Sequence, residues 1–182
     1  KKGENSRKGA LTGDMGSILV SLNTIILIFT GACAILFVIN LNTFKIERIL
    51  AMKPKFDGYA AQYDAWFMEN DKLFESELRL FKKALGDIEG KRVLSVGCGS
   101  GLFESMIDFS NIEGIEPSRD MGAIAQKRGI NVVQFGAIED AELEENAYDV
   151  IYLNGSSSYI EDLAYAFNIC KKALKPNGKF IS

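Results

Sequence analysis

Two short segments of this chain combine residue types that suit the binding of a nucleotide. An apolar run at 93–96 ends in the glycine cluster Gly97-Cys98-Gly99-Ser100-Gly101, and a second apolar run closes with Glu116, 19 residues after Gly97. Glycine allows a sharp backbone turn and the close approach of a ligand. The carboxylate of Glu116 can accept hydrogen bonds from both hydroxyls of a ribose. This layout is typical of a cofactor site at the carboxyl edge of a parallel sheet.

The spacing of the glycines narrows the choice of cofactor. A dinucleotide fingerprint, Gly-x-Gly-x-x-Gly, would place its third glycine at Leu102, whereas here it stands at Gly101. The resulting Gly-x-Gly-x-Gly resembles the first motif of the class I S-adenosylmethionine-dependent methyltransferases.

Further segments, in the family's order and spacing, extend this resemblance over residues 56–182. The segments that carry it are Tyr63-Asp64-Ala65-Trp66-Phe67, Leu94-Ser95-Val96-Gly97-Cys98-Gly99-Ser100-Gly101, Gly114-Ile115-Glu116-Pro117-Ser118, Ala147-Tyr148-Asp149-Val150-Ile151 and Leu174-Lys175-Pro176-Asn177-Gly178-Lys179.

The resemblance implies a methyltransferase that uses S-adenosylmethionine and acts on a small-molecule or lipid-like acceptor. It implies cofactor contacts from Tyr63, Gly97, Cys98, Gly99, Gly101, Glu116, Pro117, Ile138 and Asn154. It assigns no catalytic residue and no metal. The chain departs from the family pattern at Ser95 and Ala137, where the family often carries an acid. The run Ser156-Ser157-Ser158-Tyr159 reads either as a loop with a helix cap or as a polar wall facing the acceptor.

The hydrophobic pattern predicts strands that alternate with helices, hence a parallel sheet. The resemblance implies that this sheet is Rossmann-like and doubly wound, with the strand order 3-2-1-4-5. The strands are expected at 91–96, 112–116, 130–135, 148–153 and from 179, after a turn at 175–178. Helices are expected at 102–109, 121–128 and 159–174, and residues 56–90 are expected to form a helical lid. The resemblance implies seven strands, so residues 91–182 are expected to be a methyltransferase domain whose last strands are missing.

Composition excludes several classes of function. Residues 52–182 carry 15 Lys and Arg against 21 Asp and Glu, and this acidic balance argues against a nucleic-acid partner. The chain has no histidine, which removes the commonest general base and metal ligand. Its cysteines, Cys33, Cys98 and Cys170, lack metal or redox-motif spacing and are expected to be free thiols.

The first 51 residues differ in kind from the rest. Met15 to Phe44 contains no charged residue, and its apolar centre of 24 residues would span about 36 Å as a helix, enough to cross a bilayer. A transmembrane helix is therefore predicted at 17–41, between a flank at 1–16 and a linker at 42–55. It would anchor a cytoplasmic catalytic domain to the membrane. Alternatively, Met52 is the native start of a cytoplasmic protein, and residues 1–51 are an upstream extension.

Two other functions remain open. A nicotinamide-dependent oxidoreductase could share this fold, although Leu102 at the third glycine position counts against it. A membrane-tethered protein that binds the cofactor without catalysis is favoured by the departures at Ser95 and Ala137.

Overall fold

The computed structural model describes residues 54–107 and 111–182, which belong to one structural unit, residues 44–182. Its centre is a parallel sheet of five strands in the order β3-β2-β1-β4-β5. The strands are β1 (Val93–Val96), β2 (Ile112–Ile115), β3 (Asn131–Gln134), β4 (Tyr148–Tyr152) and β5 (Leu174–Ile181). The predicted order 3-2-1-4-5 is confirmed. The order reverses between β1 and β4, and ligands of such sheets bind outside the carboxyl ends at that point.

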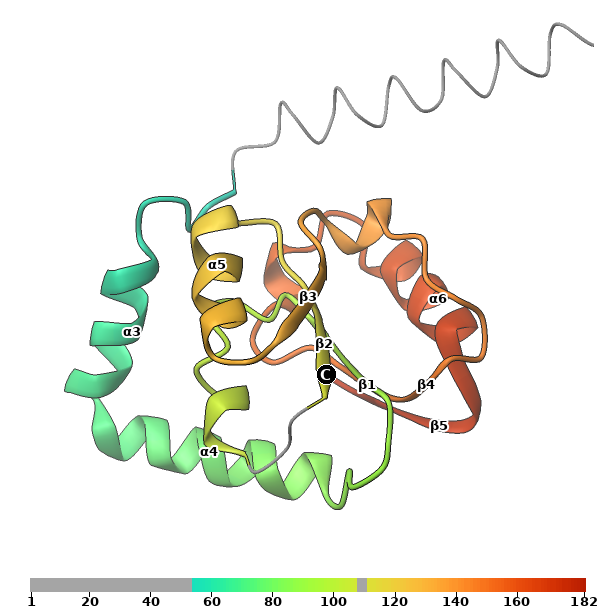
Figure 1. Cartoon of the computed structure of the whole chain (residues 1–182), viewed down its shortest axis with the longest axis horizontal. Helices are drawn as coiled ribbons and strands as arrows, with labels where there is room; N and C mark the ends of the chain where they lie inside the picture. The colour runs from blue at the N-terminus through green and yellow to red at the C-terminus, as the bar shows by residue number, and fades with distance from the viewer. Residues whose placement is uncertain (1–53, 108–110) are drawn as a thin grey trace, which may run out of the picture. The chain divides into compact units, whose positions relative to one another are not determined.

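Helices cover both faces of the sheet (Figure 1). On one face lie α3 (Ala60–Glu69), α4 (Asp71–Leu85) and α5 (Arg119–Lys127), and on the other lies α6 (Leu163–Ala173). Two apolar clusters result: the first contains Phe74 and Phe81 of α4, and the second Ala166 and Cys170 of α6. Every residue of β1 is buried between these layers, which explains its nearly continuous apolar sequence.

The predicted lid at 56–90 consists of α3 and α4, which are joined at Asn70. Helix α3 approaches the carboxyl edge of the sheet with Tyr63 and Phe67. Helix α4 packs Phe74, Phe81 and Leu85 into the core. Helix α4 ends at Gly86, whose φ of 68° suits a residue without a side chain.

The segment after the glycine cluster is not the predicted α-helix. Within its described part, residues 102–107, only the 3-10 turn η1 (Glu104–Met106) forms. The hydroxyl of Ser105 donates to the carbonyl of Leu102 at 2.7 Å, so a side chain takes an acceptor that an extended helix would use.

The last third of the chain differs from expectation at two boundaries. The helix predicted at 159–174 begins four residues later, as α6, after the capping carboxylate of Asp162. Tyr159 belongs instead to the 3-10 turn η3 (Ser157–Tyr159). The predicted turn at 175–178 lies inside β5 as an irregularity, with Asn177 at a φ of 67° and a shift in the register between β4 and β5.

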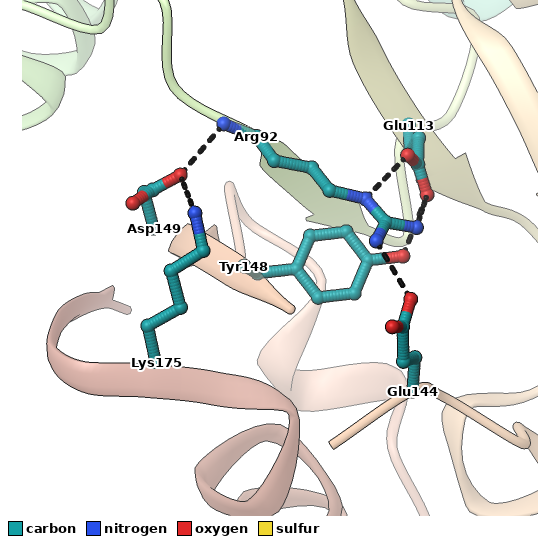
Figure 2. Close-up of polar contacts among 6 residues, drawn as sticks. All are labelled: Arg92, Glu113, Glu144, Tyr148, Asp149 and Lys175. Atoms are coloured by element: carbon teal, nitrogen blue, oxygen red, sulfur yellow. Dashed lines mark hydrogen bonds and ion pairs between the residues drawn. The ribbon is translucent and has the colours of Figure 1, made fainter. Parts of the chain in front are cut away.

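At the edge where β1 and β4 begin, a polar network ties the strands together (Figure 2). The guanidinium of Arg92 pairs with Glu113 at 2.9 Å and Glu144 at 3.0 Å and stacks on the ring of Tyr148. Burial would raise the pKa of Glu113, but the hydrogen bonds from Arg92 and Tyr148 outweigh it, so this pKa lies below its usual range. The network lies at the opposite edge from the glycine cluster and holds the strands in register.

The predicted transmembrane helix at 17–41 lies outside the described residues. Within residues 54–107 and 111–182, no helix has both the length and the apolar character needed to cross a membrane.

Candidate cofactor-binding site

The three glycines after β1 have different structural reasons to be glycine. All have positive φ, at 71°, 57° and 68° for Gly97, Gly99 and Gly101. A Cβ on Gly97 would lie 2.5 Å from the Cβ of Ser156, and one on Gly101 would lie 2.9 Å from Ile130. A Cβ on Gly99 would meet nothing within 4 Å. Gly97 and Gly101 therefore permit close packing, whereas Gly99 leaves open space beside the backbone.

Glu116 follows β2 and faces the same loop. Its Oε2 accepts from the backbone N–H of Gly99 at 2.8 Å, and its Oε1 accepts from that of Ser118 at 2.9 Å. Each oxygen keeps a second acceptor position, since a carboxylate offers about four. Burial raises the pKa of Glu116, although the two N–H groups act in the opposite direction.

A cavity of about 420 Å³ lies over the carboxyl ends of the strands. Seven of the nine residues that the sequence assigned to the cofactor line it: Tyr63, Gly97, Gly99, Glu116, Pro117, Ile138 and Asn154. The structure places Cys98 and Gly101 outside this lining. The thiol of Cys98 is buried against Gly114, where an added Cβ would lie 2.7 Å from the sulfur. Gly101 packs against Ile130, so Cys98 and Gly101 both belong to the packing beneath the loop.

The wall opposite the strands contains three aromatic residues, of which the sequence singled out Tyr63 for the cofactor and Tyr159 as the end of the serine run. The ring of Phe56 contacts Tyr63 and Tyr159 edge-on, with centroids 5.8 and 5.2 Å apart, and all three residues line the cavity. Only the apolar character of Phe56 was visible in the sequence, because its contact with Tyr159 depends on the path of two distant loops. Ser156 lines the cavity as well, and its hydroxyl donates to the carbonyl of Val96 at 2.5 Å.

Comparison with known proteins identifies the domain. The model of a methyltransferase domain family matches residues 94–182. An uncharacterized protein of Methanocaldococcus jannaschii is 33% identical over 126 residues, which cover 69% of this chain and 58% of that protein. The malonyl-[acyl-carrier protein] O-methyltransferase of Bacillus cereus is 30% identical over 119 residues, which cover 62% of this chain and 44% of that enzyme.

The crystal structure of an S-adenosylmethionine-dependent methyltransferase from Thermotoga maritima, described as a possible histamine N-methyltransferase, aligns with a TM-score of 0.62. It is 27% identical, and the alignment covers 69% of this chain and 58% of that one. The chain carries a class I S-adenosylmethionine-dependent methyltransferase domain. It spans roughly half the length of the relatives that it matches.

S-adenosylmethionine is the methyl donor of such a domain, and the residues present fit it. The cavity volume lies within the range of about 300–1,000 Å³ that is usual for small-molecule sites. The open space at Gly99 and the remaining acceptor positions of Glu116 lie side by side, because the N–H of Gly99 bonds that carboxylate. Next to β3, Ala137 offers no side-chain acceptor, but the buried Ile138 presents an apolar surface to the cavity.

A buried acid lies under the glycine loop of the methyltransferase domain, and sequence reasoning missed it. The Oε1 atom of Glu104 accepts from the hydroxyls of Ser95 at 2.9 Å and Tyr152 at 2.8 Å. Burial raises the pKa of Glu104, while the hydrogen bonds and the charge of Arg128 oppose the shift. Ser95 therefore replaces the acid common in the family, and Glu104 brings a carboxyl group to the same place. Its signal in the sequence was an acid inside an apolar segment, Leu102 to Ile107.

Proposed function

We propose that this protein transfers the methyl group of S-adenosylmethionine to a small-molecule or lipid-like acceptor. The observation that carries the proposal is the position of Glu116, which lines the cavity beside Gly97 and Gly99 with an acceptor position left on each oxygen. This arrangement suits the two hydroxyls of a ribose. The relatives named above as methyltransferases support the same reaction class.

The cofactor, when bound, supplies a methyl group on a sulfonium, from which an acceptor displaces a neutral thioether in line. The protein then has to hold the two reactants in line and exclude water. Gly97 and Gly99 would bring the backbone close to the cofactor, Glu116 would hold its ribose, and Ile138 would pack on its adenine. Phe56, Tyr63 and Tyr159 would close the cavity toward solvent.

The groups near the cavity restrict the acceptor. The chain has no histidine, and burial together with the negative charges of Glu104 and Asp64 raises the pKa of Tyr63 to about 12. Tyr63 therefore stays protonated at neutral pH and can donate a hydrogen bond but is a poor base. An acceptor that is already nucleophilic, such as a carboxylate or a neutral amine, suits this site best.

Replacement of Glu116 tests the proposal directly. Glu116→Ala should weaken the binding of S-adenosylmethionine about tenfold or more, because hydrogen bonds to a charged group contribute roughly 1.5–3 kcal/mol. Isothermal titration calorimetry of wild type and variant measures the difference. Equal affinities would show that Glu116 does not hold the ribose.

The same titrations distinguish the alternative functions. Binding of NAD in preference to S-adenosylmethionine would favour an oxidoreductase. Cofactor binding with no methylated product, assayed against carboxylate and amine acceptors with a radiolabelled methyl group, would favour the non-catalytic alternative.

We further propose that residues 17–41 anchor the catalytic domain, residues 56–182, to the cytoplasmic face of a membrane through a linker at 42–55. The uncharged stretch from Met15 to Phe44 supports this proposal. The full chain should stay in the membrane fraction after alkaline carbonate extraction. Ile26→Lys with Leu36→Lys should release it, because each charge near the centre of a span disfavours insertion by about 2.5–3.5 kcal/mol. Native protein that begins at Met52 would contradict the anchor.

A further inference from the structure

Three polar residues from distant parts of the chain form a closed ring beside the cavity. In α3, Asp64 accepts from the hydroxyl of Ser100 at 2.6 Å and pairs with Arg128 at 2.7 Å. Arg128, at the end of α5, also donates to the backbone carbonyl of Ser100 at 2.9 Å. The ring therefore joins α3, the glycine loop and the end of α5.

Two members of the ring, Asp64 and Ser100, are adjacent to residues that line the cavity. Asp64 follows Tyr63, whose ring lines the cavity and contacts Phe67 of the same helix at 5.1 Å. Ser100 lies between Gly99 and Gly101 and is almost fully buried. A displacement of α3 would therefore be transmitted through the ring to the loop that carries Gly99.

A second attachment holds the segment before α3. The carboxylate of Asp57 accepts from the hydroxyl of Ser118 at 2.6 Å, and the N–H of Gly58 donates to Asp120 at 2.8 Å. Ser118 is also the residue whose N–H binds Glu116. Residues 57–64 are thus attached to both loops of the candidate site, one that carries Gly99 and one that carries Glu116.

We propose that Asp64 and Arg128 are positioning residues that hold Tyr63 against the bound cofactor and set the backbone of the glycine loop. This inference rests on the proposed function, because it assumes that the cavity takes S-adenosylmethionine. The guanidinium is suited to the role because its separate N–H groups reach the Asp64 carboxylate and the Ser100 carbonyl together, whereas the ammonium of lysine is a point charge.

The partial exposure of the Asp64 and Arg128 side chains allows the positioning role to be distinguished from a contribution to stability alone. The side chains of Arg128 and Asp64 are 26% and 19% exposed, so water reaches both groups, and Asp64 keeps the hydrogen bond from Ser100 when Arg128 is replaced. Loss of the pair should therefore change ligand binding far more than it changes the melting temperature.

A double-mutant cycle on the full chain tests the coupling. The ligand is S-adenosylhomocysteine, and the variants are Arg128→Met, Tyr63→Ala and the double variant, with Lys127→Ala as a control at an exposed neighbour that has no described polar contact. Each single variant should weaken binding about tenfold, and the loss in the double variant should be smaller than the product of the two single losses, because part of the effect of Arg128 passes through Tyr63. Arg128→Lys should recover part of the loss, and Lys127→Ala should bind as the wild type does.

Trp66 provides a readout that does not depend on the ligand. It is the only tryptophan in the chain, lies on α3 two residues after Asp64, and is 49% exposed. Arg128→Met should make Trp66 fluorescence easier to quench with acrylamide, because α3 is then held less firmly, whereas Lys127→Ala should not.

The outcomes distinguish this inference from the proposed function. Losses of affinity that multiply in the double variant, or wild-type affinity in Arg128→Met, would overturn the positioning role. If the wild type bound no S-adenosylhomocysteine, the proposed function would fail, and unchanged quenching in Arg128→Met would then overturn the attachment of α3 as well.

Discussion

Gly99→Val should abolish measurable binding of S-adenosylmethionine while leaving the protein folded. A Cβ at this position would meet no protein atom within 4 Å, and because Gly99 lines the cavity, the valine side chain would extend into the space beside Glu116. The substitution also places a β-branched residue at a φ of 57°, a backbone strain of order 1–3 kcal/mol. Calorimetric titration measures the binding, and thermal unfolding followed by circular dichroism measures the fold.

Valine variants of two other glycines serve as controls that distinguish blocking of the cavity from backbone strain. Gly90 has a φ of 70° with open space around it but lies outside the cavity lining, so Gly90→Val should carry the strain and still bind the cofactor. Gly101→Val should lower the melting temperature most, because its Cβ would lie 2.9 Å from Ile130 and 3.2 Å from Ala125. Binding by Gly99→Val equal to that of Gly90→Val would show that the loop does not contact the cofactor.

Glu104→Gln should stabilise the protein relative to the wild type at pH 8 but not at pH 5. Burial raises the pKa of Glu104 in the folded protein above its value in the unfolded chain, so the folded state favours the protonated carboxyl group. Stability from this group is present at low pH and falls as the pH rises through the folded-state pKa. The wild type should therefore lose stability across this window.

The glutamine variant stays neutral at every pH and can still accept from Ser95 and Tyr152. It should melt a few degrees above the wild type at pH 8, which for a domain of this size corresponds to about 1 kcal/mol, and no higher at pH 5. Burial also raises the pKa of Glu116, so the stability of the Glu104→Gln variant should still fall with rising pH, but less than that of the wild type. Glu145→Gln removes one charge at an exposed position and should keep the wild-type pH dependence. An identical dependence in Glu104→Gln would mean that Glu104 has the same charge in the folded and unfolded states.

Much of the fold could be predicted because its signals are local. Apolar runs that end in glycine or an acid marked β1 and β2, and the alternation of strands with helices predicted a parallel sheet. The order 3-2-1-4-5 followed from the resemblance to the family, and the structure confirms it. Two of the predictions that failed involve side chains that compete with the backbone. Ser105 takes a carbonyl and η1 forms in place of a longer helix, while Asp162 caps α6 three residues after Tyr159.

By itself, the sequence determined the fold, the family and the residues at the carboxyl edge of the sheet, because the strand that precedes a residue places it there. Only the tertiary structure decided which side chains at that edge face the cavity. Gly99 opens onto it whereas Cys98 and Gly101 pack beneath, since the direction of a side chain depends on the path of the loop. It also brought Glu104 to Tyr152 and Arg128 to Asp64, because contacts between segments so far apart arise only when the helices pack on the sheet.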